Sequence, residues 1–190
     1  MENLTNKTVI EQIGCDDWQM NTLKLSIPYS YFAKSADLNW HDILFAIENS
    51  FLSCKSAIEH AILEFEKNEN CSQEVIELAC LLRDEAHNHV IYEFLVKLAN
   101  QTSCEEKKET KDKMLYIILN WIFDHKESYE DPLEAVECIY DDFGFPGSIV
   151  KLIRYMPSDE PPLNTVEASI ERIYNRWSNF LDVQKAKYSE

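Results

Sequence analysis

Two acidic and two histidine side chains, all of them potential metal ligands, lie between positions 84 and 89 of this sequence. Asp84 and His87 are three residues apart and Glu85 and His89 are four apart, so on a helix each pair would share one face. Such a face could hold a divalent metal. A working centre needs further ligands, and the sequence has neither an H-E-x-x-H motif nor two E-x-x-H motifs. We therefore assign no metal and no cofactor, and retain Glu85, His87 and His89 only for the alternative of a metal-dependent enzyme.

Other catalytic patterns are incomplete. Asp142-Phe143-Gly144 matches the metal-binding triplet of protein kinases, but the chain has no glycine-rich loop and no H-R-D motif. We interpret Phe143 as a core aromatic residue and Gly144 as a left-handed helix cap. No serine or cysteine stands in a known nucleophile motif. The sequence thus predicts a protein that is not an enzyme.

Acidic residues gather around one short segment, 127–142, and continue into a proline-rich loop. Such a surface could imitate the phosphates that a nuclease binds, with tyrosine rings at its edge as anchors. The alternative is a solvated helix face on which Asp131 serves only as a helix cap. The candidate interaction residues are Glu130, Glu134, Glu137, Tyr140, Asp141, Asp142, Tyr155, Asp159 and Glu160.

The composition restricts the class of partner. The 190 residues carry a formal net charge of −16, which repels nucleic-acid backbones and anionic lipids and attracts basic surfaces. With 45% apolar and 12% aromatic residues, the chain is expected to fold. We expect a basic protein partner, no direct nucleic-acid binding and no membrane contact.

The sequence also predicts a cytoplasmic location. The segment from Met1 to Gly14 lacks the continuous apolar core of a signal peptide. The longest apolar run, Met114–Phe123, is about half of the roughly 20 residues that cross a bilayer. The six cysteines include no C-x-x-C pair, which is typical of free thiols in a reducing compartment.

The elements that must position these residues are expected to be helices. Three glycines leave little room for hairpin turns or phosphate-binding loops, and apolar residues recur at helical spacing along most of the chain. We predict an all-α protein, an irregular bundle of about seven to nine helices in a single domain spanning residues 25–181. A partly helical segment, 1–24, precedes this domain, and a helix end or tail, 182–190, follows it.

Local signals place several helix ends. Residues Met114–His125 are apolar nearly all round, so this helix should lie at the centre of the bundle. Residues 72–98 fit one long helix or two helices broken near Asp84, and Gly144 should end a helix. The predicted helix starts are Ser26-Ile27-Pro28, Asn39, Ser72, Asp131-Pro132 and Thr165.

Five blocks of the sequence carry a family resemblance. They are Leu38-Asn39-Trp40-x-Asp42-Ile43, Asp131-Pro132-Leu133-x-x-Val136-Glu137-x-Ile139-Tyr140-x-Asp142-Phe143, Phe145-Pro146, Arg154-Tyr155-Met156-Pro157 and Arg176-Trp177. With them the chain, from about Leu25 to Leu181, resembles a bacterial family of domains of unknown function that is common in Firmicutes. The chain departs from the expected pattern at Phe45-Ala46, where an aromatic-glycine pair is anticipated, which concerns local helix packing.

The resemblance implies an immunity protein, because similar proteins are often encoded among small acidic genes beside polymorphic toxins. It supplies no catalytic residues. We expect a protein that binds and neutralises a cognate toxin by occlusion, without catalysis. The alternatives are a non-catalytic regulatory or scaffold helical protein and, less favoured, the metal-dependent enzyme. The identity of the toxin and the oligomeric state stay open at this level.

Overall fold

Helices make up all the regular secondary structure in the residues described by the computed structural model, which are 20–68, 70–81, 86–157, 160–161 and 163–188. The predicted all-α class is confirmed. The first half contains α2 (Tyr29–Ser35), α3 (Trp40–Glu48), α4 (Ser56–Lys67), α5 (Gln73–Ala79) and α6 (Asn88–Ala99). The second half contains α7 (Cys104–Asp124), the 3₁₀ turn η1 (Lys126–Ser128), α8 (Pro132–Asp142), the 3₁₀ helix η2 (Gly147–Leu152) and α9 (Val166–Tyr188).

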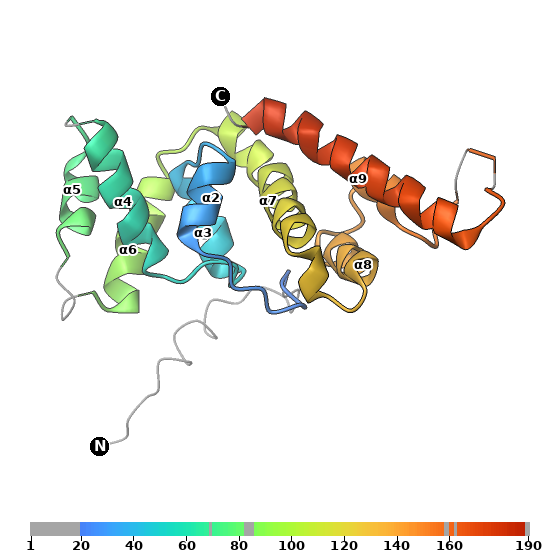
Figure 1. The fold of residues 1–190 in the computed structure, drawn as a ribbon. Coiled ribbons are helices and arrows are strands. Elements are labelled where there is room, and N and C mark those ends of the chain that lie inside the picture. The colour runs from blue at the N-terminus through green and yellow to red at the C-terminus, as the bar shows by residue number, and fades with distance from the viewer. Residues whose placement is uncertain (1–19, 69, 82–85, 158–159, 162, 189–190) are drawn as a thin grey trace, which may run out of the picture.

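The bundle is elongated, with α7 near its middle (Figure 1). Helices α4, α5 and α6 form one end, whereas α8, η2 and the start of α9 form the other. One hydrophobic core extends through both ends and includes buried residues of every α-helix from α2 to α9. The chain therefore forms a single irregular bundle, as the sequence predicts.

Side-chain caps define several helix starts. Asn39 accepts a hydrogen bond from the Asp42 amide, and the Asp42 carboxylate accepts one from the Asn39 amide, which makes a capping box at the start of α3. Ser72 caps α5 through the Val75 amide. The left-handed conformation expected at Gly144 is present, with φ of 71°, directly after α8.

Other boundaries complete the comparison with the sequence. Residues 72–98 form two helices, because α5 ends at Ala79 and α6 begins at Asn88; residues 82–85 lie outside the described ranges. In the segment 1–24, only 20–24 are described, and they form a turn and extended chain. At the other end, 182–188 continue α9.

Helix α7 forms the centre of the core, as its apolar sequence predicts. Its side chains from Met114 to Leu119, and that of Ile122, are each no more than 1% exposed. A helix that is buried on all sides needs no polar face in that stretch. None of the helices in the described part of the chain has the length and apolar character needed to span a membrane.

A buried ion pair joins α3 to α7. The Nζ of Lys113 lies 2.6 Å from the Asp42 carboxylate, whose side chain is fully buried. The Thr110 hydroxyl donates to the other Asp42 oxygen at 2.6 Å, and Lys113 also donates to the Asp37 carbonyl at 3.0 Å. Asp42 thus serves both as the capping partner of Asn39 and as the acceptor for α7, so its buried charge is well satisfied.

Helix α9 covers this centre from outside. Trp177 is fully buried and meets Phe123 of α7 edge to face, with ring centroids 5.1 Å apart. Near the end of α9, Tyr188 stacks on Tyr116, and its carbonyl accepts a hydrogen bond from the Asp37 amide at 3.0 Å. The last turn of α9 is therefore anchored to α7 and to the connection that leads into α3.

Candidate functional site

Helix α8 arranges the acidic residues that the sequence singles out. Asp131 caps the helix by accepting hydrogen bonds from the Leu133 and Glu134 amides, and Pro132 occupies the first helical position. The apolar residues of α8 pack into the core, which leaves Glu134 and Asp141, seven residues apart, exposed on one face. The expected helix start and the acidic helix face are both present.

An arginine compensates two of these acids. The guanidinium of Arg154 donates to both oxygens of Glu137 at 2.9 Å and to the Asp131 carboxylate at 2.5 Å. These charge-assisted hydrogen bonds connect the chain that follows η2 to Asp131, which caps α8, and to Glu137 within that helix. They raise the pKa of Arg154 above its ordinary value, although burial opposes this, so the side chain stays charged. Asp131 and Glu137 therefore hold the surface in shape.

Two further candidates have partners within the protein, and a third is not described. The Asp142 carboxylate accepts hydrogen bonds from the amide and the hydroxyl of Thr22. Glu160 pairs with Arg172 and Arg176 of α9, the latter at 2.6 Å. Asp159 lies outside the described residues. The structure thus separates carboxylates with protein partners from those left to solvent.

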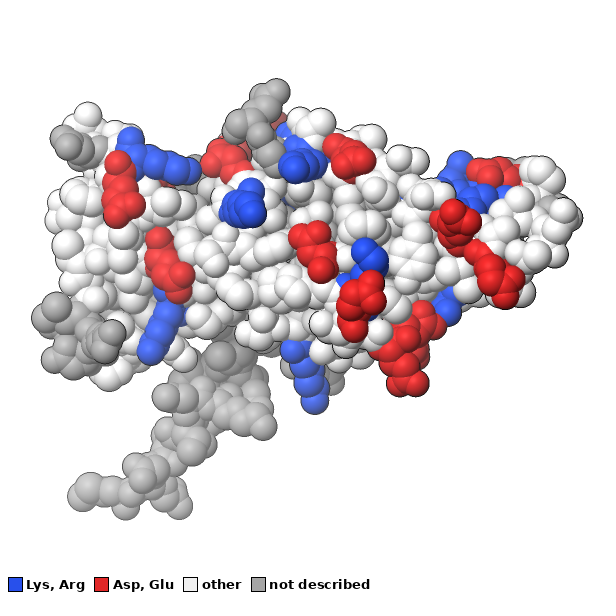
Figure 2. Space-filling model, in the orientation of Figure 1, with Lys and Arg blue, Asp and Glu red and all other residues white. Residues whose placement is uncertain are grey.

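Within the segment 127–142, four exposed carboxylates make no ion pair with a described residue. We call Glu127, Glu130, Glu134 and Asp141 the acidic face. Figure 2 shows a group of acidic side chains on the lower edge of the molecule at its α8 end, whereas acidic and basic side chains are interspersed elsewhere on the visible face. The charge of this region is therefore available to a partner in solution.

Neighbouring titratable groups report the negative potential of the region. Burial raises the pKa of the Cys138 thiol, and the carboxylates of Asp142 and Glu134 raise it further. The pKa of the Tyr155 hydroxyl is also raised, by desolvation first and then by Asp141 and Glu137. Since negative charge disfavours formation of an anion, these shifts agree in sign with an uncompensated acidic surface.

The structure corrects the role expected for Tyr140. Only 3% of this residue is exposed, and its ring packs edge to face on Phe145 with centroids 5.3 Å apart. It belongs to the apolar stripe of α8 and cannot serve as an exposed anchor. Tyr155, in contrast, is 58% exposed, and its hydroxyl lies 3.5 Å from an Asp141 carboxylate oxygen. Of the two tyrosines, only Tyr155 is accessible to a partner.

Phe145 is a surface residue that sequence reasoning missed. It is 57% exposed and has a φ of 60°, in the left-handed region that bulky residues avoid. Strained backbone that presents an apolar ring to solvent often accompanies a functional surface. The available signal was the position of this aromatic residue directly after Gly144, where the helix and its buried face have ended.

A shallow groove adjoins the acidic face at the start of α8. It has a volume of about 430 Å³ and is lined by residues of the α7–α8 connection and by one α9 side chain, namely Lys126, Glu127, Tyr129, Glu130, Pro132 and Tyr174. Burial raises the pKa of the Tyr174 hydroxyl, with further contributions from Asp131 and Glu127. The groove therefore adds aromatic and apolar surface to the carboxylates around it.

The metal-ligand candidates lie at the opposite end of the bundle. His87 and His89 are exposed, and their rings stack with centroids 5.7 Å apart at the start of α6. Their expected companions Asp84 and Glu85 lie outside the described residues. Within the described part of the chain, no three potential ligands come together. The histidine pair by itself does not define a metal centre.

Comparisons with known proteins identify the chain at the level of its family. No curated protein and no solved structure matches it. A family model described as an uncharacterized protein conserved in bacteria matches residues 29–185, which include α2 and most of α9 as well as the whole acidic face. The chain accordingly belongs to the DUF2247 family of uncharacterized proteins conserved in bacteria.

Proposed function

We propose that this protein is an immunity protein that binds a cognate bacterial toxin and neutralises it by occlusion, without catalysis. The observation that carries the proposal is the exposure of two aromatic rings near α8: Tyr155, whose hydroxyl lies 3.5 Å from an Asp141 oxygen of the acidic face, and Phe145, whose ring packs on Tyr140. Exposed aromatic residues supply most of the energy of many interfaces, whereas surrounding charges steer association. The surface has both components.

The charge of the surface favours a basic partner. Glu134 and Asp141 lie on one side of α8, and the Arg154 contacts keep the neighbouring carboxylates of Asp131 and Glu137 in a defined position. A helix whose neighbouring side chains are already fixed in this way needs little ordering when its exposed carboxylates bind a partner. It can occupy a cleft that normally receives nucleic-acid phosphates, so a nuclease toxin is the partner of best-matched chemistry.

We propose a toxin as the partner because of the family resemblance described above, since similar bacterial proteins are often encoded beside polymorphic toxins. Membership of the DUF2247 family agrees with a bacterial setting. An immunity protein must bind tightly and cover an active site, and neither requirement calls for catalytic residues of its own. The alternative is a regulatory protein that binds a different basic partner through the same surface.

The direct test is co-expression with the C-terminal domain of the adjacent large gene, which this proposal expects to be a toxin. We expect growth to be rescued and the two proteins to co-purify. Phe145→Ala and Tyr155→Ala should each weaken binding by about tenfold or more, the range for an interface aromatic residue. Phe65→Ala is the matched control, because Phe65 is also partly exposed, at 42%, but lies on α4 at the other end of the bundle.

Charge reversal tests the electrostatic part. The double variant Glu134→Lys/Asp141→Lys should slow association, and more so at low salt than at high salt. Glu74→Lys/Glu77→Lys, on α5, is the control for the same change of net charge away from this surface. Persistent toxicity with soluble co-expressed protein would contradict the immunity role and favour the regulatory one. Unchanged affinity in the aromatic and charge variants would exclude this surface as the interface.

A further inference from the structure

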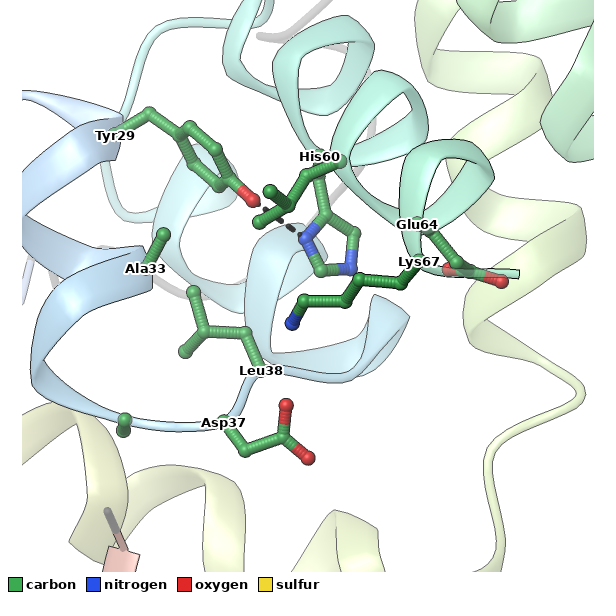
Figure 3. Close-up of a pocket in the computed structure, with 9 residues that line it drawn as sticks. Tyr29, Ala33, Asp37, Leu38, His60, Glu64 and Lys67 are labelled. Atoms are coloured by element: carbon green, nitrogen blue, oxygen red, sulfur yellow. Dashed lines mark hydrogen bonds between the residues drawn. The ribbon is translucent and has the colours of Figure 1, made fainter. Parts of the chain in front are cut away.

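A second polar site lies between α2 and α4, away from the acidic face. It is a half-open cavity of about 200 Å³ (Figure 3). Tyr29 contributes from α2, Leu38 from the connection to α3, and His60, Leu63, Glu64 and Lys67 from α4. An apolar cavity of about 150 Å³ is large enough for benzene, so this space suits a ligand of that size or slightly larger.

His60 is the most informative side chain of the cavity. The residue is only 7% exposed, and its Nδ1 lies 2.8 Å from the Tyr29 hydroxyl. Burial lowers the pKa of His60 to about 4, and the Lys67 ammonium lowers it further, so the ring is neutral near pH 7. Burial also raises the pKa of Tyr29 well above its ordinary value, which keeps its hydroxyl protonated.

These protonation states define a hydrogen-bond donor. If the Tyr29 hydroxyl donates to Nδ1, the single proton of the neutral ring must sit on Nε2. In Figure 3 the Tyr29 side of the ring carries Nδ1, and the other ring nitrogen is on the side of Lys67. Within the described residues, no side chain or backbone group is recorded as a partner of Nε2. An oriented N–H at the wall of the cavity therefore has no recorded acceptor among the described residues.

The charges at the mouth indicate which acceptor would suit it. Lys67 forms no ion pair with any described residue. Glu64, three residues earlier, receives a hydrogen bond from Trp40; burial nevertheless raises its pKa, and Lys67 opposes that rise. The Lys67 ammonium and the neutral N–H donor both favour a negatively charged acceptor, whereas Glu64 and Asp37, which also line the cavity, disfavour a dianion such as phosphate.

We propose that the cavity binds a small organic monocarboxylate, whose oxygens accept hydrogen bonds from His60 Nε2–H and Lys67 Nζ and whose apolar part packs on Leu38 and Leu63. Tyr29 acts as a positioning residue, since it selects the tautomer that turns the proton toward the ligand. This site is independent of the proposed immunity role, because it uses α2 and α4 and none of the acidic face.

The probe for the test is isobutyrate, with isobutyramide as the matched neutral molecule of nearly the same shape. Nitrogen-15 NMR of the histidine side chains reports both the tautomer and ligand binding, and His60→Gln assigns the signal. We expect Nε2–H in the free protein and a saturable shift of the His60 signals with isobutyrate at millimolar concentration. Isobutyramide should bind at least about tenfold more weakly.

Variants of one helix separate charge from packing. Lys67→Met should weaken isobutyrate binding at least about tenfold and leave isobutyramide unaffected. Lys55→Met is the control, because Lys55 is an exposed lysine directly before α4 and does not line the cavity. An Nδ1–H tautomer in the free protein, no saturable response up to about 0.1 M isobutyrate, or equal binding of acid and amide would each overturn the proposal.

Discussion

Two charged clusters of this protein have similar bond lengths and very different surroundings. Lys113 meets Asp42 at 2.6 Å between α3 and α7, and Arg154 meets Asp131 at 2.5 Å at the start of α8. The first pair is 10% and 0% exposed, whereas both members of the second are 36% exposed. Water screens the second pair and is excluded from the first. Distance alone therefore does not rank their contributions to stability.

The comparison assigns different tasks to the two clusters. Burial of Asp42 carries a desolvation cost that only its full set of partners offsets, so the core tolerates no loss of one partner. The Arg154 cluster costs little to hydrate, and its effect is to position acidic side chains on the surface. One cluster maintains the bundle, and the other shapes the region that we propose as the interface.

Removing one buried partner should have the largest effect. Lys113→Met leaves the Asp42 carboxylate buried without its counter-charge, so we expect a loss of about 3–5 kcal/mol in the free energy of unfolding. Urea denaturation followed by circular dichroism measures this. Lys108→Met, at an exposed position of the same helix, should change stability by less than about 0.5 kcal/mol.

A double variant sharpens this expectation. Asp42→Asn combined with Lys113→Met removes both charges, so it should be more stable than Lys113→Met alone despite the additional mutation. A loss below about 1 kcal/mol in Lys113→Met, or a double variant no more stable than that single variant, would mean that the pair is effectively hydrated and that the contrast between the two clusters fails.

As the pH falls, the buried His60 should lose its contribution to stability before the exposed Arg154 cluster does. The folded pKa of His60 is about 4, below the ordinary 6.5, so the unfolded chain binds the extra proton first. The contribution of His60 is complete above pH 6.5 and declines as pH falls toward 4, by about 3 kcal/mol in total. The pH dependence of unfolding, wild type minus His60→Gln, measures it.

The exposed cluster should respond only at lower pH. Desolvation would raise the pKa of Asp131, but hydrogen bonds from Arg154 and from the Glu134 amide lower it below the ordinary 3.8. Its contribution is therefore present above that value and lost as pH falls further. If wild type and His60→Gln lose stability in parallel between pH 6.5 and 4, the prediction that His60 is neutral and buried in the folded protein is wrong.

The smallest effect on stability is expected at Arg154. Arg154→Met removes partly exposed ion pairs, so we expect a loss of less than about 1 kcal/mol that shrinks further at about 0.5 M salt. Thermal unfolding at two salt concentrations measures this. A loss comparable to that of Lys113→Met, or one insensitive to salt, would contradict the difference between the buried Lys113–Asp42 pair and the exposed Arg154 cluster.

The sequence predicts interactions between near neighbours well. Asn39 and Asp42, three residues apart, form the capping box, and Asp131 and Gly144 bound α8 as expected. These contacts depend only on local backbone geometry. Tyr140 shows that two local signals can conflict. Its spacing from Val136 and Phe143 places it on the apolar stripe, whereas its acidic neighbours suggest the surface, and the structure buries it.

The rest depends on contacts that helical periodicity does not encode. Asp42 and Lys113 are 71 residues apart, and Tyr29 and His60 are 31 apart. Nothing in the spacing of these residues indicates which helices will pack together. The same is true of Thr22, which meets Asp142 across 120 residues. The acidic segment was visible in the sequence, but which carboxylates remain uncompensated was not.

The position of Tyr188 has a consequence for synthesis of the chain. Its ring lies near Lys113, with the ammonium 6.0 Å from the ring centroid, and its backbone accepts from Asp37. A nascent chain that has emerged only as far as α7 already carries Asp37 and Lys113 but not Tyr188, which contacts both. These contacts can therefore form only after α9 has been synthesised, so this part of the core depends on a segment far along the chain.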